Sequence, residues 1–178
     1  LWCSYNQLTS LDLSGHPTLR EFDCDNNKLT SVNLSDCTAL TSVAFYFNPL
    51  QTINLSGCVK LKRFGDDDFS TLPELSSLDV SGTACTTLTV INSQLTSLNI
   101  SGCTALKRVQ CQNNQLSSLN LSGCTALEEL LCQNNRLTSF SISGLPSLKM
   151  LWCENNLISQ EMTPEYYDLE WFRRDHRY

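Results

Sequence analysis

The sequence predicts a mainly β solenoid, in which short repeat units stack on one another and pair as parallel strands. Three observations lead to this prediction. The 178-residue chain repeats with a period of 21, each unit contains two short stretches of alternating apolar and polar residues, and a Ser-Gly pair recurs after the second stretch. A single unit has no core of its own, so its stability has to come from contacts with neighbouring units.

Most repeat units begin one period after the previous unit. The starting residues are Leu1, Phe22, Val43, Phe64, Leu88, Val109, Leu130 and Leu151. The step from Phe64 to Leu88 is longer than the period, so the unit at about 64–88 is irregular. We expect seven complete units and a partial eighth, about seven to eight in all, over a solenoid domain that spans residues 1–158.

The irregular unit can be aligned by its leucine pattern. Placing Leu75, Leu78 and Val80 on the equivalents of residues 8, 11 and 13 requires an insertion of four residues after Asp66 and a deletion of one after Gly82. We therefore expect a local bulge in this unit.

Each unit should contain two extended segments followed by a turn. In residues 1–4 the odd positions are apolar and point inwards, and in residues 10–13 the two leucines do so. Ser14 and Gly15 then supply a turn, because glycine readily adopts positive φ.

The cysteines follow the repeat. Five occupy the third position of a unit, namely Cys3, Cys24, Cys111, Cys132 and Cys153, and four occupy the sixteenth position, namely Cys37, Cys58, Cys103 and Cys124. Equivalent side chains of a parallel stack lie about 4.8 Å apart with parallel Cβ directions, which suits a disulfide poorly. We interpret these nine as buried structural residues, with disulfides or a metal site as the alternatives; no Cys-x-x-Cys pair is present to support zinc.

Asparagine recurs at the sixth position of the unit, where the chain leaves the first strand. A buried asparagine donates to a carbonyl and accepts from an N–H group, and so satisfies backbone groups that would otherwise be buried without a partner. We predict a structural ladder made of these residues and the third-position cysteines: Asn6, Asn27, Asn48, Asn114, Asn135 and Asn156.

No catalytic residue, cofactor or metal ligand is predicted. A cysteine nucleophile needs an exposed, electropositive setting, whereas nine of the ten cysteines are expected to be buried. Cys85 lies outside both columns and is the one candidate for a reactive thiol. We therefore expect no enzymatic activity.

Composition and charge exclude other classes. The chain is 41% hydrophobic and 17% charged, as expected of a folded domain. It has no run of 18 apolar residues, so no transmembrane helix and no direct insertion into a membrane is expected in this segment. No basic-then-apolar stretch precedes the first repeat, so no signal peptide is expected in this sequence either. A net charge of -6 with only 12 scattered Lys and Arg residues argues against binding to nucleic acid or to an anionic membrane surface.

The recurring leucine, cysteine, asparagine and Ser-Gly positions resemble leucine-rich repeats, as in LSSLNLSGCTALEELLCQNN at residues 116–135. They resemble in particular the short 21-residue kind of secreted and surface proteins of Gram-negative gut bacteria. The resemblance implies a right-handed solenoid with a parallel sheet on its concave face and short extended segments on its convex side. It also implies a non-enzymatic protein-binding module of an exported or cell-surface protein; the alternatives are a structural spacer or adhesin-type segment, or glycan binding.

Partner-binding residues are expected at the outward positions of the concave sheet. The residue types at these positions change from unit to unit, and aromatic side chains are common binding hot spots. For Trp2 and Tyr5 the alternative is burial under a preceding unit. The candidates are Trp2, Tyr5, Asp23, Asp25, Tyr46, Phe47, Asp67, Ile91, Gln110, Gln112, Leu131, Gln133 and Trp152.

The acidic residues on this face form a separate candidate. Asp23 and Asp25, together with the Asp66–Asp68 run, would attract a basic partner or a calcium ion. The alternative is a solvated acidic loop.

Residues 159–178 are predicted to form a helical cap. Thr163 is a candidate N-cap, Pro164 suits the first helical position, and arginines cluster near the end. The aromatic residues of this segment would cover the last unit, or else form an interface with another domain.

Overall fold

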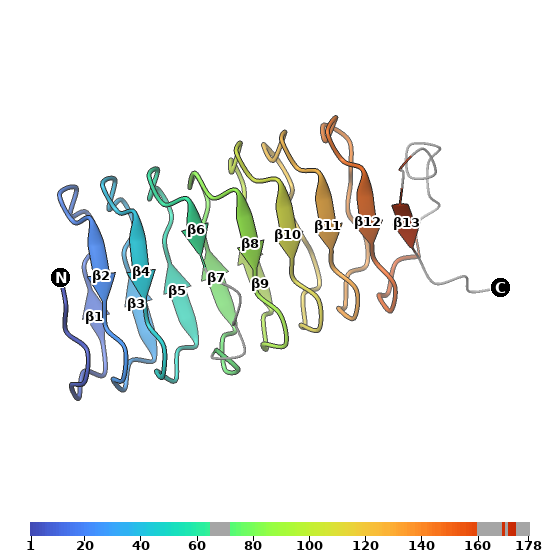
Figure 1. Cartoon of the computed structure of the whole chain (residues 1–178). Helices are drawn as coiled ribbons and strands as arrows, with labels where there is room; N and C mark the ends of the chain where they lie inside the picture. Colours follow the sequence, from blue (N-terminus) through green and yellow to red (C-terminus); the bar gives the residue numbers. More distant parts are fainter. Residues whose placement is uncertain (65–71, 160–168, 170, 174–178) are drawn as a thin grey trace.

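The computed structural model describes residues 1–64, 72–159, 169 and 171–173. The predicted fold class is confirmed: the chain is a mainly β solenoid in which each strand lies beside its equivalent in the next unit (Figure 1). No helix occurs among these residues.

The first strands of the units line one side of the stack, which we call the long face. Trp2 begins it through an isolated parallel bridge to Asp23. A two-stranded sheet and a six-stranded sheet follow, with parallel pairing throughout. Their strands are β2 (Glu21–Asp23), β4 (Ser42–Ala44), β6 (Arg63–Phe64), β8 (Thr87–Thr89), β10 (Arg108–Gln110), β11 (Glu129–Leu131), β12 (Met150–Trp152) and β13 (Trp171–Arg173).

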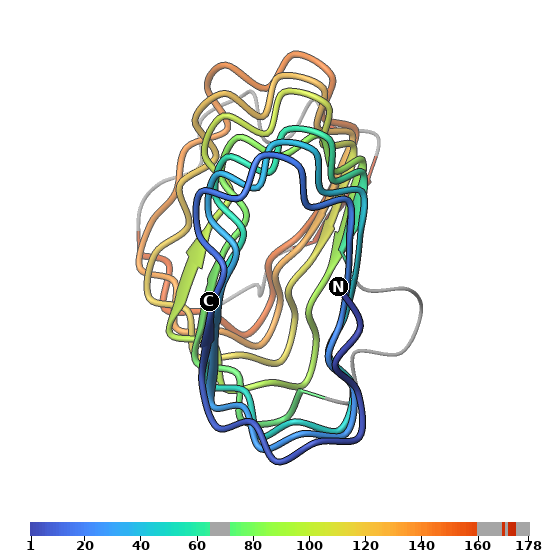
Figure 2. The ribbon, with the colours of Figure 1, turned by 90° about the vertical axis from the view of Figure 1, so that its left-hand side faces the viewer.

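The second extended segments line the opposite side, which we call the short face. They form a five-stranded parallel sheet of β1 (Leu11–Asp12), β3 (Ser31–Asn33), β5 (Thr52–Asn54), β7 (Ser77–Asp79) and β9 (Ser97–Asn99). A view along the stack shows the two faces on the opposite long sides of a narrow ring (Figure 2). An isolated bridge between Asn99 and Asn120 continues the short face by one unit.

The strand register follows the repeat period. On the long face Phe64 pairs with Leu88, a step that is longer than one period by three. On the short face the step from Ile53 to its partner Leu78 is longer by four, and the step from Leu78 to its partner Leu98 is shorter by one. These steps are what the predicted insertion and deletion require. The expected bulge itself falls within residues 65–71, outside the described residues.

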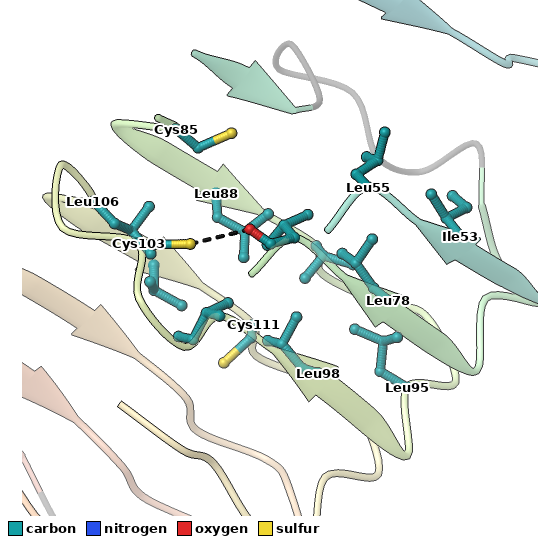
Figure 3. Close-up of a cluster of buried hydrophobic side chains, with 14 of the residues drawn as sticks. Ile53, Leu55, Leu78, Cys85, Leu88, Leu95, Leu98, Cys103, Leu106 and Cys111 are labelled. Atoms are coloured by element: carbon teal, nitrogen blue, oxygen red, sulfur yellow. Dashed lines mark hydrogen bonds between the residues drawn. The ribbon is translucent and has the colours of Figure 1, made fainter. Parts of the chain in front are cut away.

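The core fills the narrow interior between the two faces. Most of the three-residue strands bury their central residue and expose the flanking positions to different degrees, as in β3 and β10, whereas the central Val43 of β4 is half-buried. Figure 3 shows side chains from both faces meeting in this interior, among them Leu88 from the long face and Leu78 and Leu98 from the short face. Burial of one such leucine side chain stabilises the folded state by roughly 1.5–3 kcal/mol, so the stacking of repeat units is the main source of stability.

Residues 171–173 form a strand where a helical cap was predicted. Trp171–Arg173 form β13, which pairs in parallel with β12 and sets Phe172 beside Leu151. Leu169 packs against the core, one repeat period after Leu148. The repeat therefore continues here, and pairing with β12 satisfies backbone groups that a helix would satisfy internally. The predicted helix start at residues 163–164 lies outside the described residues.

In the described part of the chain, the structure has no helix with the length and apolarity needed to cross a bilayer.

Candidate functional site

The cysteines carry thiol groups that form no disulfide. All but Cys3 are buried in the interior of the stack. The sixteenth-position thiols donate to carbonyl oxygens of the preceding unit, as Cys58 does to Leu34 at 3.1 Å and Cys103 to Val80 at 3.1 Å (Figure 3). Burial raises the pKa of the Cys58 and Cys111 thiols to about 12. These thiols therefore stay protonated at neutral pH and lack the reactivity of a nucleophile.

Cys85 is not the exposed thiol that the sequence suggested. Its side chain is fully buried, and burial raises its pKa to about 11. Cys85 lies one period before Leu106, and it follows Leu61 by the same longer step that separates Phe64 from Leu88. It therefore occupies a position at which the neighbouring units have leucine. The thiol donates to the Leu61 carbonyl oxygen at 3.4 Å. The irregular step between units explains why spacing alone placed Cys85 outside the interior columns.

The sixth-position asparagines connect neighbouring units. Asn114 donates from Nδ2 to the carbonyl oxygens of Val90 at 2.8 Å and Cys111 at 3.1 Å, and its Oδ1 accepts from the Leu95 N–H at 3.1 Å. The same pattern of bonds is found at Asn27, Asn48, Asn135 and Asn156. Asn6 is exposed and donates to the Cys3 and Ser4 carbonyl oxygens of its own unit.

The fifth position of the unit has a left-handed backbone, which the sequence reasoning missed. Its φ lies between 54° and 59° at Tyr5, Asn26, Phe47, Asn92, Asn113, Asn134 and Asn155. Asparagine tolerates this conformation better than most residues. The repeated Asn-Asn pair was the signal in the sequence, because its first member takes the left-handed turn and its second bonds to the backbone.

These fifth-position asparagines also form an exposed ladder of their own. Asn113 donates to Asn92 at 2.8 Å, Asn134 to Asn113 at 2.6 Å, and Asn155 to Asn134 at 2.7 Å, in each case from Nδ2 to Oδ1. The asparagines at the fifth position of these C-terminal units therefore have a structural role.

Two aromatic residues stand at the fifth position, where five other described units have asparagine. Tyr5 and Phe47 both have a φ of 57°, and their side chains are 82% and 69% exposed. A residue other than glycine in the left-handed region costs on the order of 1 kcal/mol. Neither backbone preference nor burial among the described residues therefore explains these two aromatic side chains.

Asp23 and Asp25 lie between the aromatic residues. Tyr46 donates its backbone N–H to Asp25 Oδ1 at 2.7 Å, and the Ser4 hydroxyl donates to Asp23 Oδ1. Burial raises the pKa of the Asp25 carboxyl, the Tyr46 hydrogen bond opposes this shift, and the negative charge of Asp23 adds to it. The N-terminal patch, as we define it, comprises Trp2, Tyr5, Asp23, Asp25, Tyr46 and Phe47.

Comparisons with known proteins agree with this geometry. The family profile described as "Leucine Rich repeats (2 copies)" matches residues 125–161. The functional domain of InlJ from Listeria monocytogenes, described as including a cysteine ladder, is 25% identical with a TM-score of 0.51. Over residues 125–161 the chain is similar to leucine-rich repeats. The InlJ match covers 98% of this chain and 43% of that one, so this chain spans less than half of the InlJ chain.

Two further solved structures match with lower scores. Internalin C2 of Listeria monocytogenes is 20% identical, with a TM-score of 0.44 over 97% of this chain and 78% of its own. A leucine-rich-repeat protein of Leptospira interrogans is 19% identical, with a TM-score of 0.43 over 88% of this chain and 55% of its own. No curated protein matches the sequence significantly.

The remaining predicted partner-binding residues lie apart from the N-terminal patch. They are half-buried on the other half of the long face: Ile91, Gln110, Gln112, Leu131, Gln133 and Trp152. Gln110 accepts from the Thr89 hydroxyl at 3.2 Å, and the Oε1 atoms of Gln112 and Gln133 are buried without a hydrogen-bond partner among the described residues. Asp67 lies outside those residues.

The charged residues of this half form a ladder at its edge. Glu128 pairs with Lys107 at 3.3 Å and Lys149 at 3.4 Å, and Glu129 pairs with Arg108 at 2.7 Å. These exposed pairs contribute little to stability. Among the residues that the structure describes, no cluster of three or more His, Cys, Asp or Glu side chains has the arrangement of a metal site. The Asp66–Asp68 run, which was part of the calcium hypothesis, lies outside them.

Proposed function

We propose that this chain is a leucine-rich-repeat protein and a non-enzymatic binding module that recognises a protein partner through the long face. Leucine-rich repeats commonly serve as protein-binding modules, and the buried, protonated thiols described above are unsuited to nucleophilic catalysis. The interior columns repeat the same residue types, whereas the outward positions of the long face differ from unit to unit.

The exposed aromatic residues at left-handed positions carry this proposal. Phe47 is 69% exposed with a φ of 57°, at a position where four other units use an asparagine that bonds to its neighbour. A phenylalanine side chain cannot make the side-chain hydrogen bonds of that asparagine ladder, and it adds exposed apolar surface. Contact with a partner gives such a side chain a role, because buried aromatic anchors dominate binding energy at protein interfaces.

We also propose that the module belongs to an exported or cell-surface bacterial protein. This location is supported by the resemblance of the 21-residue repeat to that of secreted and surface bacterial proteins. The similarity to InlJ of Listeria monocytogenes supports a bacterial origin.

The short face offers a second surface, which glycan binding would use. Exposed hydroxyls of Ser10, Ser31 and Thr52 line a shallow hollow there. The neighbouring Asn33 and Asn54 use Oδ1 to accept from the backbone N–H two residues later, at 3.2 Å and 3.0 Å. These side chains therefore stabilise the turns of the fold, and the short face supplies the control surface for a binding experiment.

The test compares three purified proteins on one protein microarray: the unchanged chain, a Tyr46→Ala/Phe47→Ala variant of the long face, and a Ser31→Ala/Thr52→Ala variant of the short face. Thermal melts by circular dichroism verify that all three are folded. We expect partners that bind the unchanged chain and the short-face variant and are lost from the long-face variant. Partners that the long-face variant retains and the short-face variant loses would overturn the proposal.

A further inference from the structure

The N-terminal patch consists of an acidic row between two aromatic rows. Each row comes from one of three consecutive repeat units. The backbone N–H of Tyr5 donates to the Asp25 carbonyl oxygen at 2.9 Å, and that of Asn26 to the Tyr46 carbonyl oxygen at 2.9 Å, so the three units are direct neighbours. The rows are Trp2 and Tyr5, then Asp23 and Asp25, then Tyr46 and Phe47.

The spacing of the aromatic rows leaves room for a flat group. Tyr5 and Phe47 occupy equivalent positions two units apart, which separates their backbones by ~10 Å in a parallel sheet. The shorter side chain of Asn26 lies between them. A group seated midway would lie ~5 Å from each ring, within the ~6 Å over which an aromatic face attracts a cation.

The carboxylates of the acidic row have no positive partner among the described residues. Ion pairs in that part of the chain join Lys107, Arg108 and Lys149 to glutamates on the other half of the long face. The amino group of Leu1 donates to the Glu21 carbonyl oxygen at 2.7 Å, not to either aspartate. In both Asp23 and Asp25 the carboxylate oxygen Oδ1 accepts hydrogen bonds from neighbouring residues. The other oxygen of each carboxylate, Oδ2, has no hydrogen-bond partner among the described residues.

The chemistry of the patch selects the occupant. An apolar segment would remove water from Asp23 and Asp25 without pairing their charges, which is costly. Calcium takes six to eight oxygen ligands, and the two described carboxylates fall far short of that number. A guanidinium group stacks on aromatic faces and bonds carboxylates through its planar set of N–H donors.

We infer that the N-terminal patch binds an arginine side chain of a polypeptide partner, with the guanidinium stacked between the Tyr5 and Phe47 rings and bonded to the Asp23 and Asp25 carboxylates. This inference rests on the proposed function and names its partner class. Lysine satisfies the charge without the stacking, so it should bind more weakly.

The test titrates the ¹⁵N-labelled chain with the synthetic peptide Ac-Gly-Arg-Gly-Arg-Gly-NH₂ and follows its amide signals by NMR. Matched peptides carry citrulline or lysine at both arginine positions; citrulline has nearly the shape of arginine without its charge. We expect the arginine peptide to shift the signals of Tyr5, Asn26 and Phe47, the lysine peptide to bind several-fold more weakly, and the citrulline peptide to leave the signals unchanged.

Two variants locate the site without removing the fold. Phe47→Asn installs the residue that other units use at this position, and Asp25→Asn keeps the Oδ1 acceptor for the Tyr46 N–H. Each should weaken arginine-peptide binding at least about tenfold, whereas Ser31→Ala on the short face should leave it unchanged. Equal binding of the citrulline peptide, no shift with the arginine peptide, or full affinity in Phe47→Asn would each overturn the inference.

The two proposals fail differently. A microarray partner that requires Tyr46 and Phe47 but binds equally well after its arginines are replaced overturns arginine recognition and leaves the long face as the binding surface. A partner that needs the short face instead overturns the proposed function.

Discussion

Asn114 donates from Nδ2 to the Val90 carbonyl oxygen at 2.8 Å and thereby connects two repeat units. Replacing Asn114 with leucine would leave that carbonyl and the Leu95 N–H buried without partners. We expect Asn114→Leu to lower the free energy of unfolding by about 1–3 kcal/mol, measured by chemical denaturation. Asn6→Leu is the matched control, because Asn6 is exposed and bonds within its own unit. Equal stability of Asn114→Leu and the unchanged chain would refute the role of the asparagine column.

Gly123 lies close against the backbone of Gly102. A Cβ at Gly123 would stand 3.0 Å from the Gly102 Cα, whereas a Cβ at Gly144 would meet nothing within 4 Å. The two glycines have similar φ values, 80° and 83°. Gly144→Ala should therefore cost about 1–2 kcal/mol for the left-handed backbone alone, and Gly123→Ala should cost about 1–3 kcal/mol more because the stack has to shift. Denaturation curves of the pair would show no difference if this close approach were unimportant.

Stability should fall as the pH rises above 9. Burial raises the pKa of the Cys111 thiol from its usual 9.0 to about 12, so between these values the unfolded chain releases a proton that the folded chain keeps. The unfolded state is thereby favoured, and the melting temperature decreases with pH. Cys111→Ala should flatten this decrease between pH 9 and 10.5 relative to the unchanged chain. Parallel melting curves for the two proteins would argue against a buried, protonated thiol.

The same burial predicts slow chemical modification. With iodoacetamide at pH 7.5, native protein should label first at Cys3, the one half-buried thiol, and the other nine should react only after unfolding. Mass spectrometry of the alkylated peptides gives the order of labelling. Rapid modification of Cys85 in the native protein would restore the hypothesis that it is a reactive thiol.

Much of the fold could be predicted because the same residue pattern recurs in each repeat unit. The period fixes which strands pair, and the leucine pattern locates the insertion and the deletion around Leu78. Backbone conformation is less visible. The left-handed turn at Asn113 has no hydropathy signature, and the tyrosine and phenylalanine at the same position in other units conceal it further.

Two predictions were wrong, the helix at residues 171–173 and the position of Cys85 outside the interior columns. Pro164 and the late arginines resemble helix signals, yet Leu169 and Phe172 continue the columns of the repeat, and strand pairing at β13 follows those columns. Cys85 seemed isolated because the one-residue deletion after Gly82 moves it into the leucine column. The location of the binding surface depends on exposure and φ together, which only the structure supplies.

Phe47→Asn tests the central claim most directly, because it asks whether this aromatic side chain serves the fold. The measurement is the free energy of unfolding of the variant relative to the unchanged chain. We predict that it is unchanged or higher by up to about 1 kcal/mol, since asparagine suits the left-handed backbone and little core contact is lost. A loss of more than about 1 kcal/mol would show that Phe47 packs within the fold and would contradict its assignment to recognition.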